Sequence, residues 1–587
     1  MEVAKVAMAM TIVALPISIK YLPMTLASDT QIVSGSKKSL LSDPFLQLPT
    51  KSTVNVVWFT EFAGDKHWVE YGSPLQQRVK ATTTKLRQVR EDKDSQIDNF
   101  PTQTIVRNIW RHEAIVKDLE PNKRIPYKVK SSLAGQTITS DVFTLASNPT
   151  SDKPLKILLT SDHQLMPMTT ANLGKVDETI GRLDAVFLPG DLVNVPDRAS
   201  EWFDDRRGNS FFPALQGKGN YELERNGVKT IYKGGEIIQH SPLFTAIGNH
   251  EVMGNRSQPT LKTEFNNPIP RPIATNFYRQ VASKINPTDD LKLEQDWIES
   301  NSFNTNTYEE IFSLPKNNTD GKYYATTFGS IRLISLYVTN IWRSPNLSAE
   351  DIGRYKESNN NLNSPEKWGY GQHIFESIAK GSPQYQWLQR ELASEAYQQA
   401  KYKIVMLHHP PHTLGGNIVP PYTEPQQKPY YAEDGKLRSL YYDYPIKDDY
   451  IIRDLIPLLE SAGVQLVYYG HSHLWNRFKS DSGMHFLESS NVGNSYGAHT
   501  EDNPRPIPSY NSGNYAALGN PNGLDPIVPN IDPLIDEAGQ PMPYVASNDI
   551  TVFSIFNTET GTVSSYRYDT RKPGSDAIKF DEFRLGR

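Results

Sequence analysis

Lys-Ile-Leu-Leu-Thr-Ser-Asp-His-Gln at residues 156–164 and Ala-Val-Phe-Leu-Pro-Gly-Asp at residues 185–191 decide the fold of this 587-residue chain. Each stretch begins with a short apolar run of buried-strand type and leads into a turn that carries an aspartate. Asp162 and Asp191 lie about thirty residues apart, which is the length of one βαβ unit. The two stretches therefore predict successive parallel strands, each with a carboxylate at its end.

Four further apolar runs of the same kind follow, at residues 243–247, 331–336, 403–407 and 464–469. Segments with helical periodicity alternate with them, for example at residues 385–392 and 451–459. Such alternation of strands and helices is typical of a layered α/β domain. We therefore predict an α/β fold for the larger part of the chain.

Polar residues follow three of these runs where the predicted strands end. They are Asn249, His250 and Glu251, then His408 and His409, and finally His471 and His473. Ligands bind at the carboxyl ends of the strands in open α/β sheets. We therefore expect these clusters to converge with Asp162 and Asp191 on one rim.

The residue types in these clusters are those that bind a pair of metal ions. Carboxylates, an amide carbonyl and imidazoles suit Mn, Zn or Fe, and one aspartate can bridge two ions. The chain has no cysteine, which excludes thiolate ligands and cysteine nucleophiles. Gly190, Gly248 and Gly470 precede the clusters, where a residue without Cβ allows a sharp turn and a close approach of the backbone.

The bulk composition is typical of a globular protein, and its net charge gives it no general attraction to polyanions. Hydrophobic residues make up 37% and charged residues 22%, and the formal net charge is -5. No bulk positive field is available to attract nucleic acid or an anionic membrane. We expect a small-molecule partner and no nucleic-acid partner, and the sequence does not predict an oligomeric state.

The region before the first of these strands has a different pattern. Residues 53–146 contain alternating β-type runs with turn residues between them, which predicts a β-sandwich of about a hundred residues. The polar segment 148–154, bounded by prolines, is typical of a linker. We predict a β-domain at residues 50–148, an α/β domain at 154–500, and an extension at 501–587 that ends in a closing β-hairpin.

The N-terminus predicts export, to the periplasm or to the extracellular space. An apolar stretch from Val6 to Ile19 and small residues near Ala27 resemble a secretory signal peptide over residues 1–27. An uncleaved anchor or a buried helix is the alternative, because Glu2 and Lys20 depart from the usual pattern. In the exported form we expect no membrane insertion after processing, since no second long apolar run follows.

The ordered motifs resemble the signature of calcineurin-like metallophosphoesterases. The residues that carry this resemblance are Asp162, Gly190-Asp191, Gly248-Asn249-His250-Glu251, His408 and Gly470-His471-Ser472-His473. The β-type region before them is similar to the fibronectin-III-like N-terminal domain of purple acid phosphatases. The resemblance implies a β-sandwich followed by an αββα-layered metallophosphoesterase domain.

The resemblance also implies a role for each residue. Asp191 would bridge two metal ions of Fe, Zn or Mn, His250 would assist the leaving oxygen, and Glu251 would orient His250. His409 remains an alternative to His408, because each has a proline two residues later. The implied ligands are Asp162 and His473 for the first ion and Asn249, His408 and His471 for the second.

The implied function is metal-dependent hydrolysis of phosphate esters, with monoesters as the expected substrates. A phosphodiesterase or a nucleotide hydrolase on the same site is the close alternative. A surface-binding protein with a decayed metal site is the alternative from another class, since two residues depart from the family pattern. Gln164 stands where many members have a histidine ligand, and Asn194 stands where purple enzymes have the iron-binding tyrosine.

These two departures predict the optical spectrum. Without a tyrosinate ligand we expect no purple charge-transfer colour, a site less selective for ferric iron, and Gln164 as a weak neutral ligand. The measurement is the visible absorption spectrum of the metal-loaded protein. A strong visible band would contradict this prediction.

Overall fold

The computed structural model describes residues 39–98, 101–256, 258, 260–316, 321–345, 347–348 and 351–586. The predicted signal peptide, residues 1–27, lies outside these described residues. Among them, no helix has both the length and the apolar character needed to span a bilayer. Residues Leu40–Arg587 form one compact unit.

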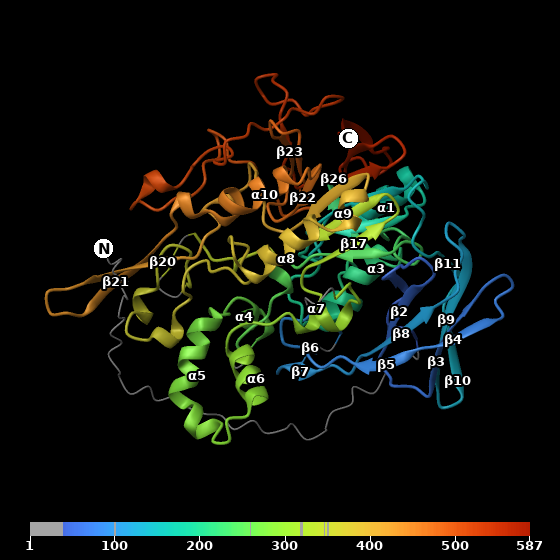
Figure 1. The fold of residues 1–587 in the computed structure, drawn as a ribbon, viewed down its shortest axis with the longest axis horizontal. Coiled ribbons are helices and arrows are strands. Elements are labelled where there is room, and N and C mark those ends of the chain that lie inside the picture. Colours follow the sequence, from blue (N-terminus) through green and yellow to red (C-terminus); the bar gives the residue numbers. More distant parts are fainter. Residues whose placement is uncertain are drawn as a thin grey trace. The chain divides into compact units, whose positions relative to one another are not determined.

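The N-terminal part of this unit is a sandwich of two antiparallel sheets (Figure 1). Trp58 and Tyr127, one from each sheet, are fully buried between them, and the Trp58 indole donates to Ser131 Oγ at 2.9 Å. The predicted β-rich N-terminal region is thus confirmed. The two sheets contain β1 (Phe45–Gln47), β2 (Val54–Thr60), β5 (Thr82–Lys85) and β8 (Trp110–Val116), and β3 (Lys66–Tyr71), β4 (Gln77–Lys80), β9 (Ile125–Leu133), β10 (Gln136–Thr139) and β11 (Phe143–Leu145).

Two larger sheets form the α/β part, which confirms the predicted fold class. The first has the order β16-β13-β12-β26-β27-β28, and the second β17-β18-β19-β22-β24-β23-β25. The strands of the first are β12 (Lys156–Leu159), β13 (Ala185–Leu188), β16 (Leu243–Thr245), β26 (Ile550–Asn557), β27 (Thr562–Asp569) and β28 (Ile578–Arg584). Those of the second are β17 (Tyr324–Phe328), β18 (Ile331–Ser335), β19 (Tyr402–Met406), β22 (Leu466–Tyr469), β23 (Trp475–Lys479), β24 (His485–Ser489) and β25 (Tyr544–Val545).

Alternating side chains explain how the second sheet is buried on both faces. In β19, Ile404 and Met406 join the core shared with the first sheet, whereas Val405 points to the opposite face. Val405 belongs there to a second core with Leu388 of α8 (Pro383–Leu392) and Leu459 of α10 (Ile456–Ser461). Successive residues of a strand point to opposite faces, so a continuous apolar run serves two cores.

Helices also cover the first sheet. The helix α1 (Thr169–Ile180) contacts β26, and its Leu173 and Val176 pack into the core with aromatic residues of α2 (Ala199–Phe203) and α3 (Phe211–Leu215). Each of the two sheets therefore has its own helical layer. The connections after β16 contain α4 (Leu261–Phe265), α5 (Arg271–Ile285), α6 (Leu291–Asn301) and α7 (Asn306–Ile311).

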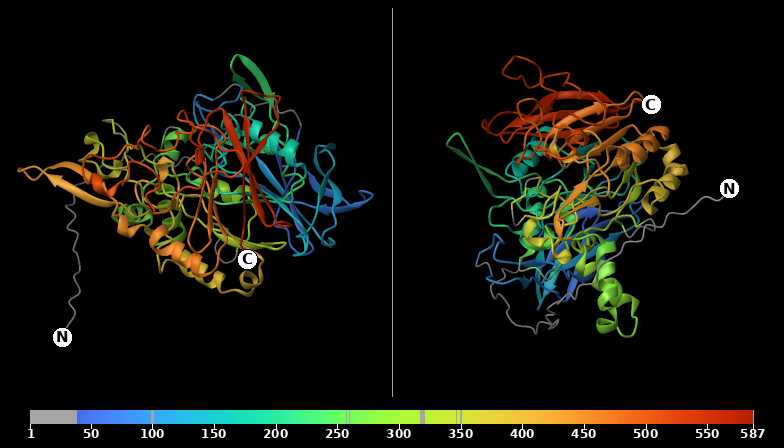
Figure 2. Two further views of the ribbon diagram at one scale, coloured as in Figure 1. Left: turned by 90° about the horizontal axis from the view of Figure 1, so that it is seen from above. Right: turned by 90° about the vertical axis from the view of Figure 1, so that its left-hand side faces the viewer.

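The first sheet is completed by the end of the chain. The strand β12 pairs in parallel with β13 on one side and antiparallel with β26 on the other, with Leu159 opposite Ser554. The segment at residues 550–584 forms a three-stranded meander of β26, β27 and β28. In Figure 2 these strands are red, and the hairpin of β20 (Gln426–Tyr431) and β21 (Leu437–Asp443) is orange and projects from the rest.

A buried ion pair joins the two sheets near the end of the chain. Arg477 of β23 donates from Nε and Nη2 to the two carboxylate oxygens of Asp581 in β28, at 2.6 and 3.1 Å. Both side chains are almost fully buried. Removal of one partner from such a pair leaves a buried charge without compensation.

We therefore expect Asp581→Ala to lower the free energy of unfolding by about 3–5 kcal/mol. The matched control is Asp569→Ala, because Asp569 pairs with Arg571 at the surface, where loss of an ion pair costs below about 1 kcal/mol. The measurement is chemical denaturation of both variants and the wild type. Equal destabilisation by the two substitutions would contradict the prediction.

Candidate metal centre

The site lies where the carboxyl ends of strands from both large sheets meet. Asp162, Asp191 and Asn249 follow the parallel strands β12, β13 and β16 of the first sheet. His408 and His471 follow the parallel strands β19 and β22 of the second sheet. The predicted convergence therefore brings together the edges of two sheets.

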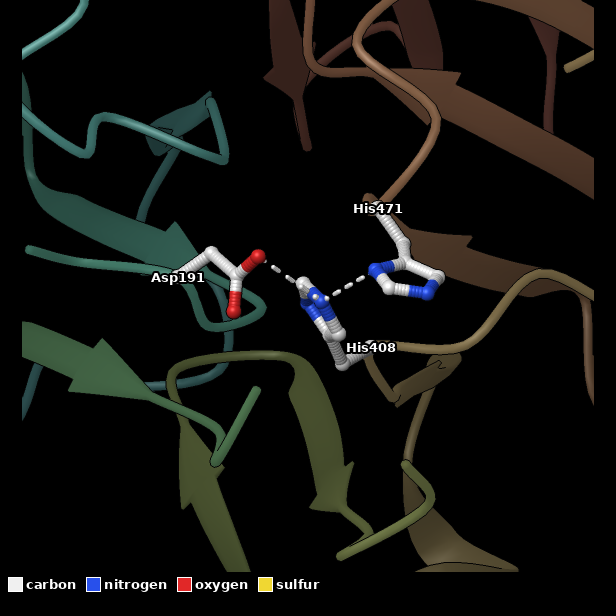
Figure 3. Close-up of side chains that lie close together, drawn as sticks. All are labelled: Asp191, His408 and His471. Carbon is white, nitrogen blue, oxygen red and sulfur yellow. Dashed lines mark hydrogen bonds and ion pairs between the residues drawn. The ribbon is translucent and has the colours of Figure 1, made fainter. Parts of the chain in front are cut away.

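One group of ligand atoms centres on His408. Its Nδ1 lies 2.8 Å from the carbonyl oxygen of Pro189, which can only accept, so Nδ1 carries a proton. Its Nε2 faces Asn249 Oδ1 at 3.1 Å, His471 Nδ1 at 3.0 Å and Asp191 Oδ2 at 3.3 Å. Figure 3 shows His408 between Asp191 and His471. When His408 Nε2 is unprotonated these atoms all offer lone pairs, and either a proton on Nε2 or a metal ion satisfies them together.

A second group shares Asp191. Ligand atoms of Asp162, Asp191 and His473 lie within 4.8 Å of one another, as do those of Asp191, His408 and His471. The ring of His473 is oriented by the carbonyl of Asn494, 3.0 Å from Nδ1, which leaves Nε2 3.5 Å from Asp162 Oδ1. The donor set therefore fits two metal ions that share the carboxylate of Asp191.

The electrostatics also favour positive charge at this place. Burial raises the pKa of Asp191, but the positive charge of His408 more than offsets this and holds that pKa well below its usual range. Burial lowers the pKa of the His408 imidazole, while the Asp191 carboxylate raises it to about 9. Each shift follows from an opposite charge at close range inside the protein.

Backbone conformation is strained at the candidate ligands. Asp162, Asp191, His471 and His473 all have φ between 55° and 83°, in the left-handed region that L-residues rarely adopt. Each such residue costs about 1–3 kcal/mol, and such residues cluster at functional sites. A Cβ on the nearby Gly248 would strike the Asp191 carboxylate, which explains the glycine at that position.

The two residues that depart from the family pattern lie beside the site. The Gln164 amide donates to Asp191 Oδ2 at 2.9 Å, and its buried Oε1 has no hydrogen-bond partner among the described residues. An amide oxygen is thus available as a neutral ligand. The side-chain amide of Asn194 donates to the backbone carbonyl of Gln164 at 2.6 Å. The backbone carbonyl of Asn194 lies 2.7 Å from His250 Nδ1.

Glu251 does not orient His250, contrary to the sequence-based expectation. Its carboxylate accepts from the backbone N–H groups of Asp191 and Gly248 at 2.8 and 2.7 Å, and from that of Leu192 at 2.8 Å. Burial and the charge of Asp191 raise its pKa to about 8, although the three N–H groups oppose this. Glu251 therefore joins the two turns that carry Asp191 and Asn249.

Glu488 supports a ligand-bearing turn of the second sheet as Glu251 does in the first, and the sequence motifs did not predict this role. It accepts from the backbone N–H of Ser472, between His471 and His473, at 2.7 Å, and from Thr413 Oγ1 at 2.7 Å. Burial raises its pKa to about 8. Its only sequence signal is an acidic residue within the apolar strand β24.

The other histidines lie outside the two groups. His409 packs against Tyr422 at 4.7 Å between ring centroids, and burial lowers its pKa to about 3. His412 is buried against Phe486, with 4.5 Å between the ring centroids. Of the neighbouring pair, His408 is the one that faces Asp191.

A cavity of about 760 Å³ opens onto the site. Asp191, Asn249, His250, His471 and His473 all line it, together with Gln164 and Asn194. The N-terminal region also contributes, since Lys93, Asp94 and Gln96 follow β6 (Arg90–Glu91) and lie on the cavity wall. A small substrate can therefore reach the metal-ligand groups from solvent.

The comparisons with known proteins agree with this geometry. The calcineurin-like phosphoesterase model matches residues 155–474, more than half of the chain. The purple acid phosphatase PPD1 isolated from yellow lupin (Lupinus luteus) seeds has a similar fold, with a TM-score of 0.51 and 15% identity over 93% of this chain and 74% of that chain. No curated protein sequence is a significant match. The chain belongs to the calcineurin-like phosphoesterase family, as its motifs predicted.

Proposed function

We propose that the chain hydrolyses phosphate monoesters at a two-metal site between the two large sheets. The observation that carries the proposal is the position of the Asp191 carboxylate, which lies in both groups of ligand atoms. The bound ions, of Fe, Zn or Mn, would activate water and stabilise charge on the attacking and leaving oxygens. In this proposal both ions would share Asp191, with Asp162, His473 and Gln164 as the residues that would hold the first and Asn249, His408 and His471 as those that would hold the second.

We expect His250 to serve the leaving oxygen. In the reaction, water adds to phosphorus, the bond from phosphorus to the leaving oxygen breaks, and that oxygen takes up a proton. The Asn194 carbonyl fixes Nδ1 of His250 as a donor, so Nε2 is the atom that can hold the transferred proton. Such assistance contributes about 10²–10⁴ in rate.

Two lysines favour monoesters over diesters. Lys93 and Lys262 line the cavity, and neither forms an ion pair within the described part of the chain. A phosphate monoester carries close to two negative charges at neutral pH, whereas a diester carries one. The additional charge gives the monoester a stronger interaction with these ammonium groups.

Export remains part of the proposal on sequence grounds. The apolar stretch at residues 6–19 and the small residues that follow support a signal peptide. The expected substrate is a small phosphate ester, and no contact with nucleic acid or insertion into a membrane is proposed.

The central test compares two substrates on metal-loaded protein. We expect p-nitrophenyl phosphate to be hydrolysed with a higher kcat/KM than bis-p-nitrophenyl phosphate. Asp191→Ala should lower kcat/KM by more than about 10³-fold and reduce the bound metal, because both ions lose a ligand. The control is Asp434→Ala, in the exposed turn between β20 and β21. Inactivity of the wild type on both esters with metal bound would disprove the proposal.

A second prediction concerns Glu251, which positions the backbone that carries two ligands. We expect Glu251→Ala to weaken metal binding by about 10–100-fold, since removal of a supporting residue around a metal site has effects of this size. The measurement is metal titration of the metal-free protein. Glu391→Ala is the control, because Glu391 is a largely buried glutamate that pairs with Arg332 and lines no part of the cavity. Wild-type affinity in a folded Glu251 variant would contradict the assignment.

A further inference from the structure

Three aromatic side chains line the cavity that leads to the metal-ligand groups. They are Phe265, Trp342 and Tyr496. All nine tryptophans lie in described residues, and Trp342 is the only one among the exposed large hydrophobic side chains, with 42% of its surface accessible. Tyr496 is 68% exposed. Exposed aromatic rings that share the wall of one cavity offer apolar surface to a ligand in that cavity.

Two of these rings lie next to functional histidines. Phe265 packs against His250 with a centroid distance of 4.7 Å, and Tyr496 stacks on His473 at 6.1 Å with an interplanar angle of 23°. His250 is the proposed donor to the leaving oxygen. Phe265 is therefore adjacent to the position that the leaving group would occupy, and Tyr496 lies beside the candidate ligand His473.

The segments that carry the rings are fixed by the surrounding structure. Arg343, next to Trp342, is buried and donates to the carbonyls of Asn266 and Pro268, which joins the Trp342 segment to the Phe265 segment. Asn548 both donates to and accepts from the backbone of Ser495, which precedes Tyr496. A binding surface held in this way loses little conformational entropy when a ligand binds.

We propose that Trp342 and Tyr496 form a subsite for a planar aromatic leaving group, which is the ring of an aryl phosphate or the base of a nucleotide. The inference rests on the proposed phosphomonoesterase function and names its substrate class. Trp342 lines the cavity and keeps 42% of its surface accessible, so part of its indole is available to a ligand ring. Stacking on aromatic side chains tolerates any ring with a π-face.

The test measures KM and kcat for three monoesters: phenyl phosphate, adenosine 5′-monophosphate and glycerol 3-phosphate. We expect Trp342→Ala and Tyr496→Ala each to raise KM for the two aromatic substrates by about tenfold, the effect of losing one stacking partner. KM for glycerol 3-phosphate should change less than about twofold, because it has no ring to stack. An effect on the nucleotide alone identifies the base as the occupant, and an effect on both identifies any planar ring.

Two further variants separate a binding role from general disturbance. Tyr496→Phe keeps the ring and should retain wild-type KM. Tyr431→Ala removes a tyrosine of similar exposure, 64%, from the projecting β20–β21 hairpin outside the cavity, and should change none of the three values. Equal losses on all three substrates, or no change in the alanine variants, would overturn the inference. If the wild type hydrolyses none of the three, the proposed function fails instead.

Discussion

The shared carboxylate of Asp191 is the constraint on which the site depends. It lies among the lone-pair atoms of both metal-ligand groups, is buried, and has a left-handed backbone conformation. Buried lone-pair atoms repel one another unless a cation lies between them. The folded protein therefore strongly favours the binding of a cation at this point. The edges of both sheets must meet there, because the atoms around Asp191 come from each.

Two buried glutamates provide the support that this arrangement requires. Glu251 accepts from backbone N–H groups in the turns of the first sheet, and Glu488 accepts from the Ser472 N–H in the second. Each carboxylate satisfies donors that no neighbouring strand reaches, since the chain has left the sheet at these turns. Side chains that never contact substrate thus determine where the ligands lie.

Much of this arrangement could be predicted from the sequence, because apolar runs followed by Asp, Asn or His mark strand ends. The α/β fold was predicted in this way, the β-rich N-terminal region from alternating β-type runs, and the family from the ordered motifs. All three predictions are confirmed. The sequence did not reveal that the ligands come from two sheets, because strand pairing between distant segments leaves no local pattern. Backbone acceptors such as the carbonyls of Pro189 and Asn494 were also missed, since any residue supplies a carbonyl. The partner predicted for Glu251 was wrong, because its actual partners are backbone N–H groups, which almost any residue supplies.

The pairing of β12 with β26 has a consequence for how the active enzyme forms. Leu159, three residues before Asp162, lies opposite Ser554, so the two strands are separated by about 400 residues of chain. Contacts between such distant segments are slow to form, because the entropy of the intervening loop must be lost first. During synthesis the first sheet remains incomplete until β26 has left the ribosome. The turn that carries Asp162 therefore gains its neighbouring strand only after every other candidate ligand has been synthesised, because His473 precedes β26 in the chain.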